Sequence, residues 1–144
     1  HNLLFFGYFG IIYSVAGLTG VWVLLLSVWF GVSFGAVIPY VEHNFEDVHW
    51  GRRPELTAQT AALEGSAVLD FGDTFHLITA NIGFHDLHHL NPMIPSYNLK
   101  RCYEDMENRG ELHSRKIGIR EAISCFRWKL WDEQQKKMVT FSAA

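Results

Sequence analysis

The chain has 144 residues and a formal net charge of −3 at pH 7, which gives no indication of a nucleic-acid partner. Its charges are unevenly distributed, because every Lys, Arg, Asp and Glu lies at or after Glu42 and the run from Asn2 to Val41 has none. A charged side chain at the centre of a membrane-spanning helix costs roughly 2.5–3.5 kcal/mol. The uncharged run therefore predicts a membrane-embedded region, followed by a polar one.

The uncharged run is too long for one membrane span. As a single helix, Leu3 to Val41 would extend about 58 Å, whereas the hydrocarbon core of a bilayer is about 30 Å thick. The small residues of "GLTG" (Gly17 to Gly20) suit a tight reversal. We therefore predict that residues 1–41 form a transmembrane domain, an antiparallel hairpin of Leu3–Ala16 and Val21–Val41. A buried core hairpin of a soluble protein is the alternative.

The polar region, residues 42–144, is expected on the cytoplasmic side. All twelve Lys and Arg residues follow the second predicted span, and positive charges favour the cytoplasmic face of a membrane. Cys102 and Cys125 form no C-x-x-C pair, and in that compartment both are expected to be reduced thiols. We predict a helical cytoplasmic domain here, which makes the expected fold class all-α.

Three helices are expected within the polar region. The first runs from Asp73 to His89, with apolar residues at helical spacing, and prolines stop it from Pro92 onward. The second is a surface helix, Leu99–Asn108. The third, Ile119–Val139, combines apolar positions at helical spacing with basic residues. It is predicted to be an amphipathic helix that lies in the membrane interface or packs against the protein's own cytoplasmic domain.

The stretch "NIGFHDLHHL" (residues 81–90) places three histidines within five positions. On a helix, His85, His88 and His89 would lie within an arc of about 100°. Convergent imidazoles repel each other if protonated and leave nitrogens unpaired if neutral and buried. A metal ion removes both problems, and imidazole suits zinc, copper, iron and nickel. We therefore predict a metal site, whereas His76 would lie on the opposite face and is expected to be structural.

The histidine triplet and the residues around it resemble segments of the membrane fatty acid desaturases. "HDLHH" (His85 to His89) matches that family's third histidine box, H-x-x-H-H. "ANIGFHDLHHLNPMIPSYNL" (Ala80 to Leu99) resembles its stretch N-I-G-x-H-x-x-H-H-L followed by I-P-x-Y-x-L. "VEHNFED" (Val41 to Asp47) is similar to a segment at the cytoplasmic end of the last spanning pair. "EGS" (Glu64 to Ser66) and "KLWDE" (Lys129 to Glu133) resemble further pieces of bacterial and acyl-lipid members.

The resemblance implies a di-iron centre on the cytoplasmic side of a four-span helical bundle. Two iron ions would use dioxygen to insert a cis double bond into an acyl chain, with electrons from ferredoxin or a cytochrome b5-like donor. The implied partners are the lipid membrane, a fatty acyl substrate and the electron-donor protein. Carried over residue by residue, the implied metal ligands are His43, His85, His88 and His89.

The chain departs from the family pattern in one respect. The first two histidine boxes of the family lie upstream of the final span pair, and no residue before Asn2 can supply them. We therefore expect the chain to be the C-terminal portion of a desaturase, inactive by itself.

Some polar residues near the boxes have expected supporting roles. Glu46 and Asp47 are candidates to orient His43, as carboxylates often do for metal-bound imidazole; ion pairs with Arg52 or Arg53 are the alternative. Asn81 would share the face of the triplet and is a candidate hydrogen-bonding residue. His49 is expected to be structural or to support a metal ligand, and His113 is expected to be solvated.

Two other functions compete with the desaturase. A histidine-box hydroxylase or ketolase would keep the fold and change the product, although the "NIG" and "IPSYNL" flanks favour the desaturases. A non-enzymatic membrane subunit could bind zinc or haem through the same histidines. Two irons per full-length chain would support the enzyme, and one zinc would exclude it.

Overall fold

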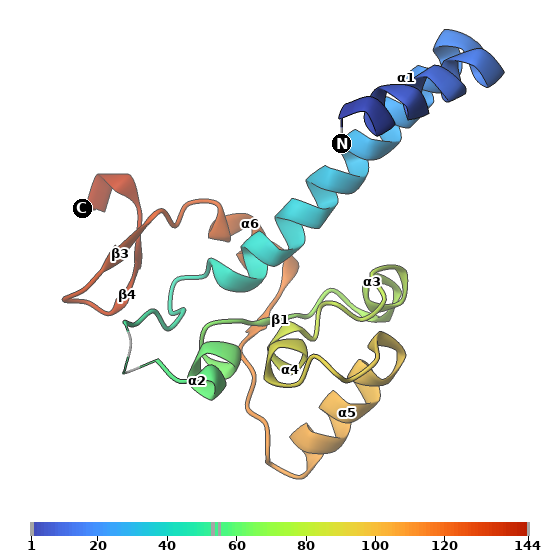
Figure 1. Ribbon diagram of the computed structural model, residues 1–144. Coiled ribbons are helices and arrows are strands. Elements are labelled where there is room, and N and C mark those ends of the chain that lie inside the picture. The colour runs from blue at the N-terminus through green and yellow to red at the C-terminus, as the bar shows by residue number, and fades with distance from the viewer. Residues whose placement is uncertain (1, 53, 55, 144) are drawn as a thin grey trace. The chain divides into compact units, whose positions relative to one another are not determined.

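The computed structural model describes residues 2–52, 54 and 56–143, and this part of the chain is mostly helical (Figure 1). It divides into two units, residues 1–37 and 38–144. The first helix, α1 (Asn2–His43), supplies the whole of the first unit and ends inside the second.

The first unit is an uncharged helical segment with no buried residue among residues 2–37. α1 is the one described helix that is long and apolar enough to cross a membrane. Its backbone leaves the helical region at Gly17, where φ is 59° and ψ is −160°, a conformation that glycine adopts without strain. The break falls inside the predicted turn, but Leu18 to Gly20 are already helical. The antiparallel arrangement of the two stretches stays a prediction.

The second unit consists of short helices around a two-stranded parallel pair. β1 (Val68–Leu69) pairs with β2 (Lys116–Ile117), in the register Val68 to Lys116 and Leu69 to Ile117. Figure 1 shows α2 (Ala58–Leu63) and α4 (His85–Leu90) close to β1, and α4 packs against both and against α5 (Ser96–Asn108). The remaining elements are α3 (Asp73–Ile78), α6 (Ile119–Cys125), β3 (Leu130–Asp132), β4 (Lys137–Val139) and the 3-10 turn η1 (Phe141–Ala143).

β1 separates two clusters of buried apolar side chains. Successive side chains of a strand point to opposite faces, so Val68 packs in one cluster and Leu69 in the other. The Leu69 cluster contains Val41 and Phe45, from the end of α1 and the residues after it. The Val68 cluster contains Leu87 of α4. The short strand thereby fixes the end of α1 and helix α4 within one folded unit.

The prediction of a single helix from Asp73 to His89 is wrong, because the helix is interrupted between Ile78 and His85. α3 ends at Ile78 and α4 begins at His85, and Ala80 and Asn81 between them have positive φ, 53° and 61°. The turn is held by β1, because the Leu69 N–H donates to the Gly83 carbonyl over 2.9 Å. Helical periodicity carries no information about this pairing with a distant strand.

The amphipathic helix predicted over Ile119–Val139 ends at Cys125. The residues that follow form an antiparallel hairpin of β3 and β4, in which Trp131 faces Met138. The Asp132 carboxylate accepts hydrogen bonds from the N–H groups of Gln134 and Gln135, which stabilises the turn locally. The predicted surface helix Leu99–Asn108 is confirmed as α5, which starts slightly earlier, after Pro95.

Candidate metal centre

Three histidine side chains meet in the second unit. The Nε2 atom of His43 lies 3.0 Å from that of His85 and 3.1 Å from that of His89, and the last two are 3.0 Å apart. Nitrogens bound at about 2.0–2.2 Å to one ion, at bond angles of 90–110°, would be roughly 2.8–3.6 Å apart. The three nitrogens therefore have the spacing of neighbouring ligands on a single metal ion.

The backbone presents the three imidazoles to each other. His85 and His89 are one helical turn apart on α4, so their side chains share a face. His43 is the last residue of α1, and the carbonyl of Glu42 next to it accepts the N–H of Ala67 over 2.9 Å. This bond attaches the end of α1 to the segment that leads into β1. The two parts of the site, 42 residues apart in sequence, are thus joined through the same strand.

The hydrogen bond of His43 fixes which of its nitrogens is free. Nδ1 lies 2.8 Å from the carbonyl oxygen of Gly65. A carbonyl only accepts, so Nδ1 carries the proton and, in the neutral ring, Nε2 presents a lone pair to the other two histidines. This is the arrangement usual for a metal-binding histidine, whose second nitrogen donates to a backbone or carboxylate oxygen.

Buried His85 and the more exposed His89 both stay neutral, because their surroundings disfavour a charged imidazole. Burial, with the charges that His89 and His43 would carry, lowers the pKa of His85 to about 3. Burial, followed by His43 and His88, also lowers the pKa of His89. Near neutral pH both rings are therefore in the form that binds metal. When each ring carries its proton on Nδ1, the three Nε2 lone pairs converge on a point that a cation can occupy, so the donor set fits zinc, copper, iron or nickel.

His88 lies beside this group and is not part of it. Its ring centroid is 5.9 Å from that of His85 and 6.0 Å from that of His89. The prediction that the three histidines of the box converge on one point is therefore met by two of them. The predicted proximity of His43 to the box is confirmed, although about forty residues separate them in sequence. The role of each histidine as a ligand stays a prediction.

Two other residues singled out by helical spacing lie outside the group. His76 is buried and stacks on the ring of Phe84, with ring centroids 4.3 Å apart, so its expected structural role agrees with its position. Asn81 donates its side-chain N–H to the carbonyl of Ser96 over 2.9 Å. Its side-chain amide therefore links the turn between α3 and α4 to the first residue of α5.

The two carboxylates expected to orient His43 pair with cations elsewhere. Asp47 accepts from Nε of Arg115 at 3.1 Å, and Glu46 lies 3.6 Å from Nζ of Lys137. The orienting role is therefore wrong, because the end of α1 turns both side chains toward later parts of the chain. The alternative partner Arg52 pairs with Glu133 at 3.3 Å, and Arg53 lies outside the described residues.

Two buried carboxyl groups near the histidines were missed. Glu42 is fully buried, with Oε2 3.3 Å from Nδ1 of His85. Asp86 is also fully buried; it accepts from the N–H of Leu87 at 2.7 Å and from the Ser114 hydroxyl. Burial raises the pKa of Asp86. The sequence could have indicated both acids by their positions, because Glu42 directly precedes His43 and Asp86 lies inside the histidine box.

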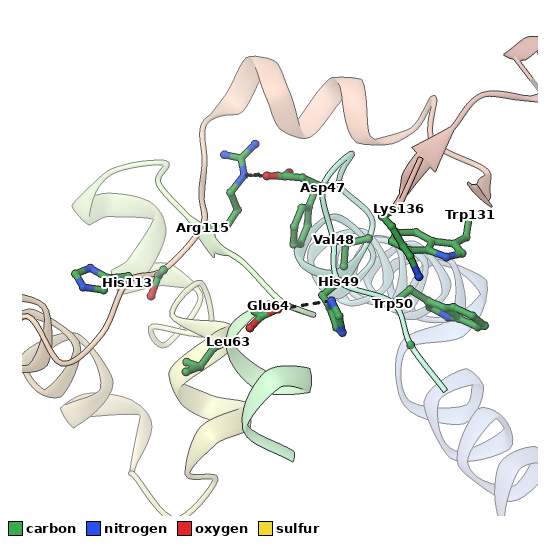
Figure 2. A pocket seen from close by; sticks show the side chains of 13 residues that line it. Asp47, Val48, His49, Trp50, Leu63, Glu64, His113, Arg115, Trp131 and Lys136 are labelled. Carbon is green, nitrogen blue, oxygen red and sulfur yellow. Dashed lines mark hydrogen bonds and ion pairs between the residues drawn. The ribbon is translucent and has the colours of Figure 1, made fainter. Parts of the chain in front are cut away.

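A separate hollow of about 630 Å³ lies on another part of the second unit (Figure 2). His49 faces Glu64 there, with Nδ1 3.6 Å from the carboxylate, and Arg115 faces Asp47. Trp131 lines the same hollow. None of the three converging histidines lines it, so it is distinct from the candidate metal centre.

A group of imidazoles at the end of a long apolar helix defines a candidate membrane metalloprotein. The chain belongs to the fatty acid desaturase family, whose family model matches residues 2–120. The family resemblance read from the histidine box is thereby confirmed.

Three relatives show the extent of the similarity. A fatty acid desaturase of Bacillus subtilis is 32% identical over 77% of this chain and 31% of its own length. An sn-1 oleoyl-lipid 12-desaturase of Picosynechococcus is 29% identical over 72% of this chain and 30% of its own length. A chloroplastic omega-6 fatty acid desaturase of Arabidopsis thaliana is 33% identical over 70% and 23%, respectively. The chain thus matches less than a third of each relative, and no solved structure matches it.

Proposed function

We propose that this chain is the C-terminal portion of a membrane fatty acid desaturase, a di-iron enzyme that inserts a cis double bond into an acyl chain with dioxygen. The observation that carries the proposal is the convergence of the His43, His85 and His89 Nε2 atoms within 3.1 Å of one another. Membership of the desaturase family gives that convergence its chemical meaning.

The residues of this chain would hold part of the iron centre. His43, His85 and His89 have the spacing of ligands to one ion. His88 lies outside that group, with its ring centroid 6.0 Å from that of His89, and we assign it to the di-iron centre on the family resemblance. When bound, the iron ions supply dioxygen activation and the oxidising power for removal of hydrogen from the acyl chain. The remaining ligands would come from the two histidine boxes upstream, so we expect the 144-residue chain alone to be inactive.

The protein surface supports a placement at the membrane. The described residues of the first unit are uncharged and unburied, as a lipid-facing segment would be. A hairpin of Leu3–Ala16 and Val21–Val41, reversing at Gly17, would bring the end of α1 to the cytoplasmic face. Residues 42–144 would then lie in the cytoplasm, where ferredoxin or a cytochrome b5-like protein supplies electrons. The substrate would be a fatty acyl chain within the membrane.

The test is expression of the full-length protein in a host whose lipids lack the product. We expect a new cis double bond in the host's fatty acids and two irons per purified chain. His113, which is exposed and is not one of the three converging histidines, provides the matched histidine control. His113→Ala should retain the product, and His89→Ala should lose it. A hydroxylated product would favour the hydroxylase, and one zinc per chain without a product would contradict the proposal.

A further inference from the structure

Glu42 is the one described acidic side chain that is fully buried and makes no hydrogen bond through either oxygen. A buried carboxyl group without a partner is costly, because it has lost its hydration and gained nothing in return. Asp86, the other fully buried acid, receives two hydrogen bonds. Asp86 therefore has hydrogen-bonding partners, whereas Glu42 lacks one and would be stabilised by gaining one.

The candidate partner of Glu42 is Nδ1 of His85, the ring nitrogen that does not face the other two histidines. Oε2 of Glu42 lies 3.3 Å from Nδ1 of His85, which also makes no hydrogen bond of normal geometry. An N–H···O hydrogen bond is typically about 2.7–3.2 Å long, so a small adjustment would let the two groups form one. The carbonyl of Ile82 is a second, uncharged acceptor near the same ring.

We propose that Glu42 is a positioning residue, which accepts the Nδ1 proton of His85 and so holds its Nε2 lone pair toward the metal. The inference rests on the proposed function, because it requires a metal at the three-histidine group. His43 shows the same design with a different acceptor, since its Nδ1 bonds to the Gly65 carbonyl at 2.8 Å. Burial, then the Asp86 carboxyl group, raises the pKa of Glu42 to about 9, so near neutral pH the carbonyl oxygen of a protonated carboxyl group is the acceptor.

Three variants of the full-length protein separate positioning from packing. Glu42→Gln keeps an oxygen that accepts the Nδ1 proton and replaces the carboxyl group by an amide, whereas Glu42→Leu keeps most of the volume and removes the acceptor. Glu46→Gln is the matched control, because this carboxylate belongs to the same segment but pairs with Lys137 at the surface. Each purified variant is compared by its thermal unfolding, its metal content and the rate at which a chelator removes bound cobalt(II).

We expect Glu42→Leu to release cobalt faster and to bind it more weakly by about 10–100-fold, the usual effect of losing such a partner. Glu42→Gln should stay within about threefold of the parent protein, while its visible cobalt absorption bands shift because the acceptor at His85 Nδ1 changes from a carboxyl to an amide oxygen. Glu46→Gln should change neither quantity. If Glu42→Leu does not fold, the band shift in Glu42→Gln decides the matter.

Two outcomes would overturn the inference: unchanged cobalt release in folded Glu42→Leu, or unchanged absorption bands in Glu42→Gln. A parent protein that binds neither iron nor cobalt would instead contradict the proposed function. The two failures are therefore distinguishable.

Discussion

The two units of this chain differ in what they do with their apolar residues. Residues 2–37 leave large side chains such as Leu3 and Trp29 exposed and bury none, whereas the second unit encloses Leu69, Leu87 and Ile117 completely or nearly so. A soluble monomer rarely exposes so large an apolar surface. The first unit therefore needs a lipid or protein environment, while the second forms a core of its own, and the histidines are held by that core.

The largest expected effect is loss of a metal ligand. Replacing His89 by alanine in the full-length enzyme should reduce desaturation below detection and lower bound iron, because one of three convergent nitrogens is lost. His89 is solvent-exposed, so the second unit should still fold. Product analysis and metal analysis check this against His113→Ala. Full activity in the His89 variant would contradict the proposed assignment of His89 as a metal ligand.

A charge in the first unit comes next. Val32→Arg should impair membrane insertion by roughly 2.5–3.5 kcal/mol, or about two orders of magnitude in the insertion equilibrium. Met93→Arg, at a similarly exposed residue of the second unit, should leave insertion unchanged. The fraction resistant to alkaline extraction from membranes measures both. Equal insertion of the two variants would show that the first unit does not face lipid.

A cavity in the second unit should have a smaller effect. Leu87 is 1% exposed and lies directly between His85 and His89 in sequence. Leu87→Ala should destabilise the second unit by about 2–5 kcal/mol, seen as a lower unfolding midpoint. Leu26→Ala, in the first unit, where Leu26 is 53% exposed, serves as the control and should shift the midpoint little. A larger effect at Leu26 would reverse the comparison between the units.

The smallest effect concerns Cys125, which is fully buried in the second unit. Burial, then the nearby Glu121 carboxylate, raises its pKa from 9.0 to about 11. The folded state therefore keeps the proton in a range where the unfolded chain loses it, and stability should fall as pH rises from 9 toward 11. By pH 10 the loss should be on the order of 1 kcal/mol. Unfolding midpoints of Cys125→Ala should lack this contribution, and those of Cys102→Ala should keep it.

Local patterns determined the features that depend on neighbouring residues. The absence of charge before Glu42 indicated the apolar helix, and the i, i+4 spacing placed His85 and His89 on one face of α4. α5 followed from its own periodicity. His43 entered through the family resemblance, and its distance from the histidine box was then confirmed.

Tertiary contacts decided the rest, because the interactions involved join residues far apart in sequence. β1 interrupts the expected long helix before the box by pairing with Gly83, and it also fixes the end of α1. Glu42 lies close to His85, and Asp47 pairs with Arg115. Both contacts depend on how distant segments of the second unit pack together. The sequence by itself thus determined which residues were candidates for the metal centre. Only the packing around β1 decided which imidazoles meet and which carboxyl group lies behind them, since hydrogen bonds and burial act through space and not along the chain.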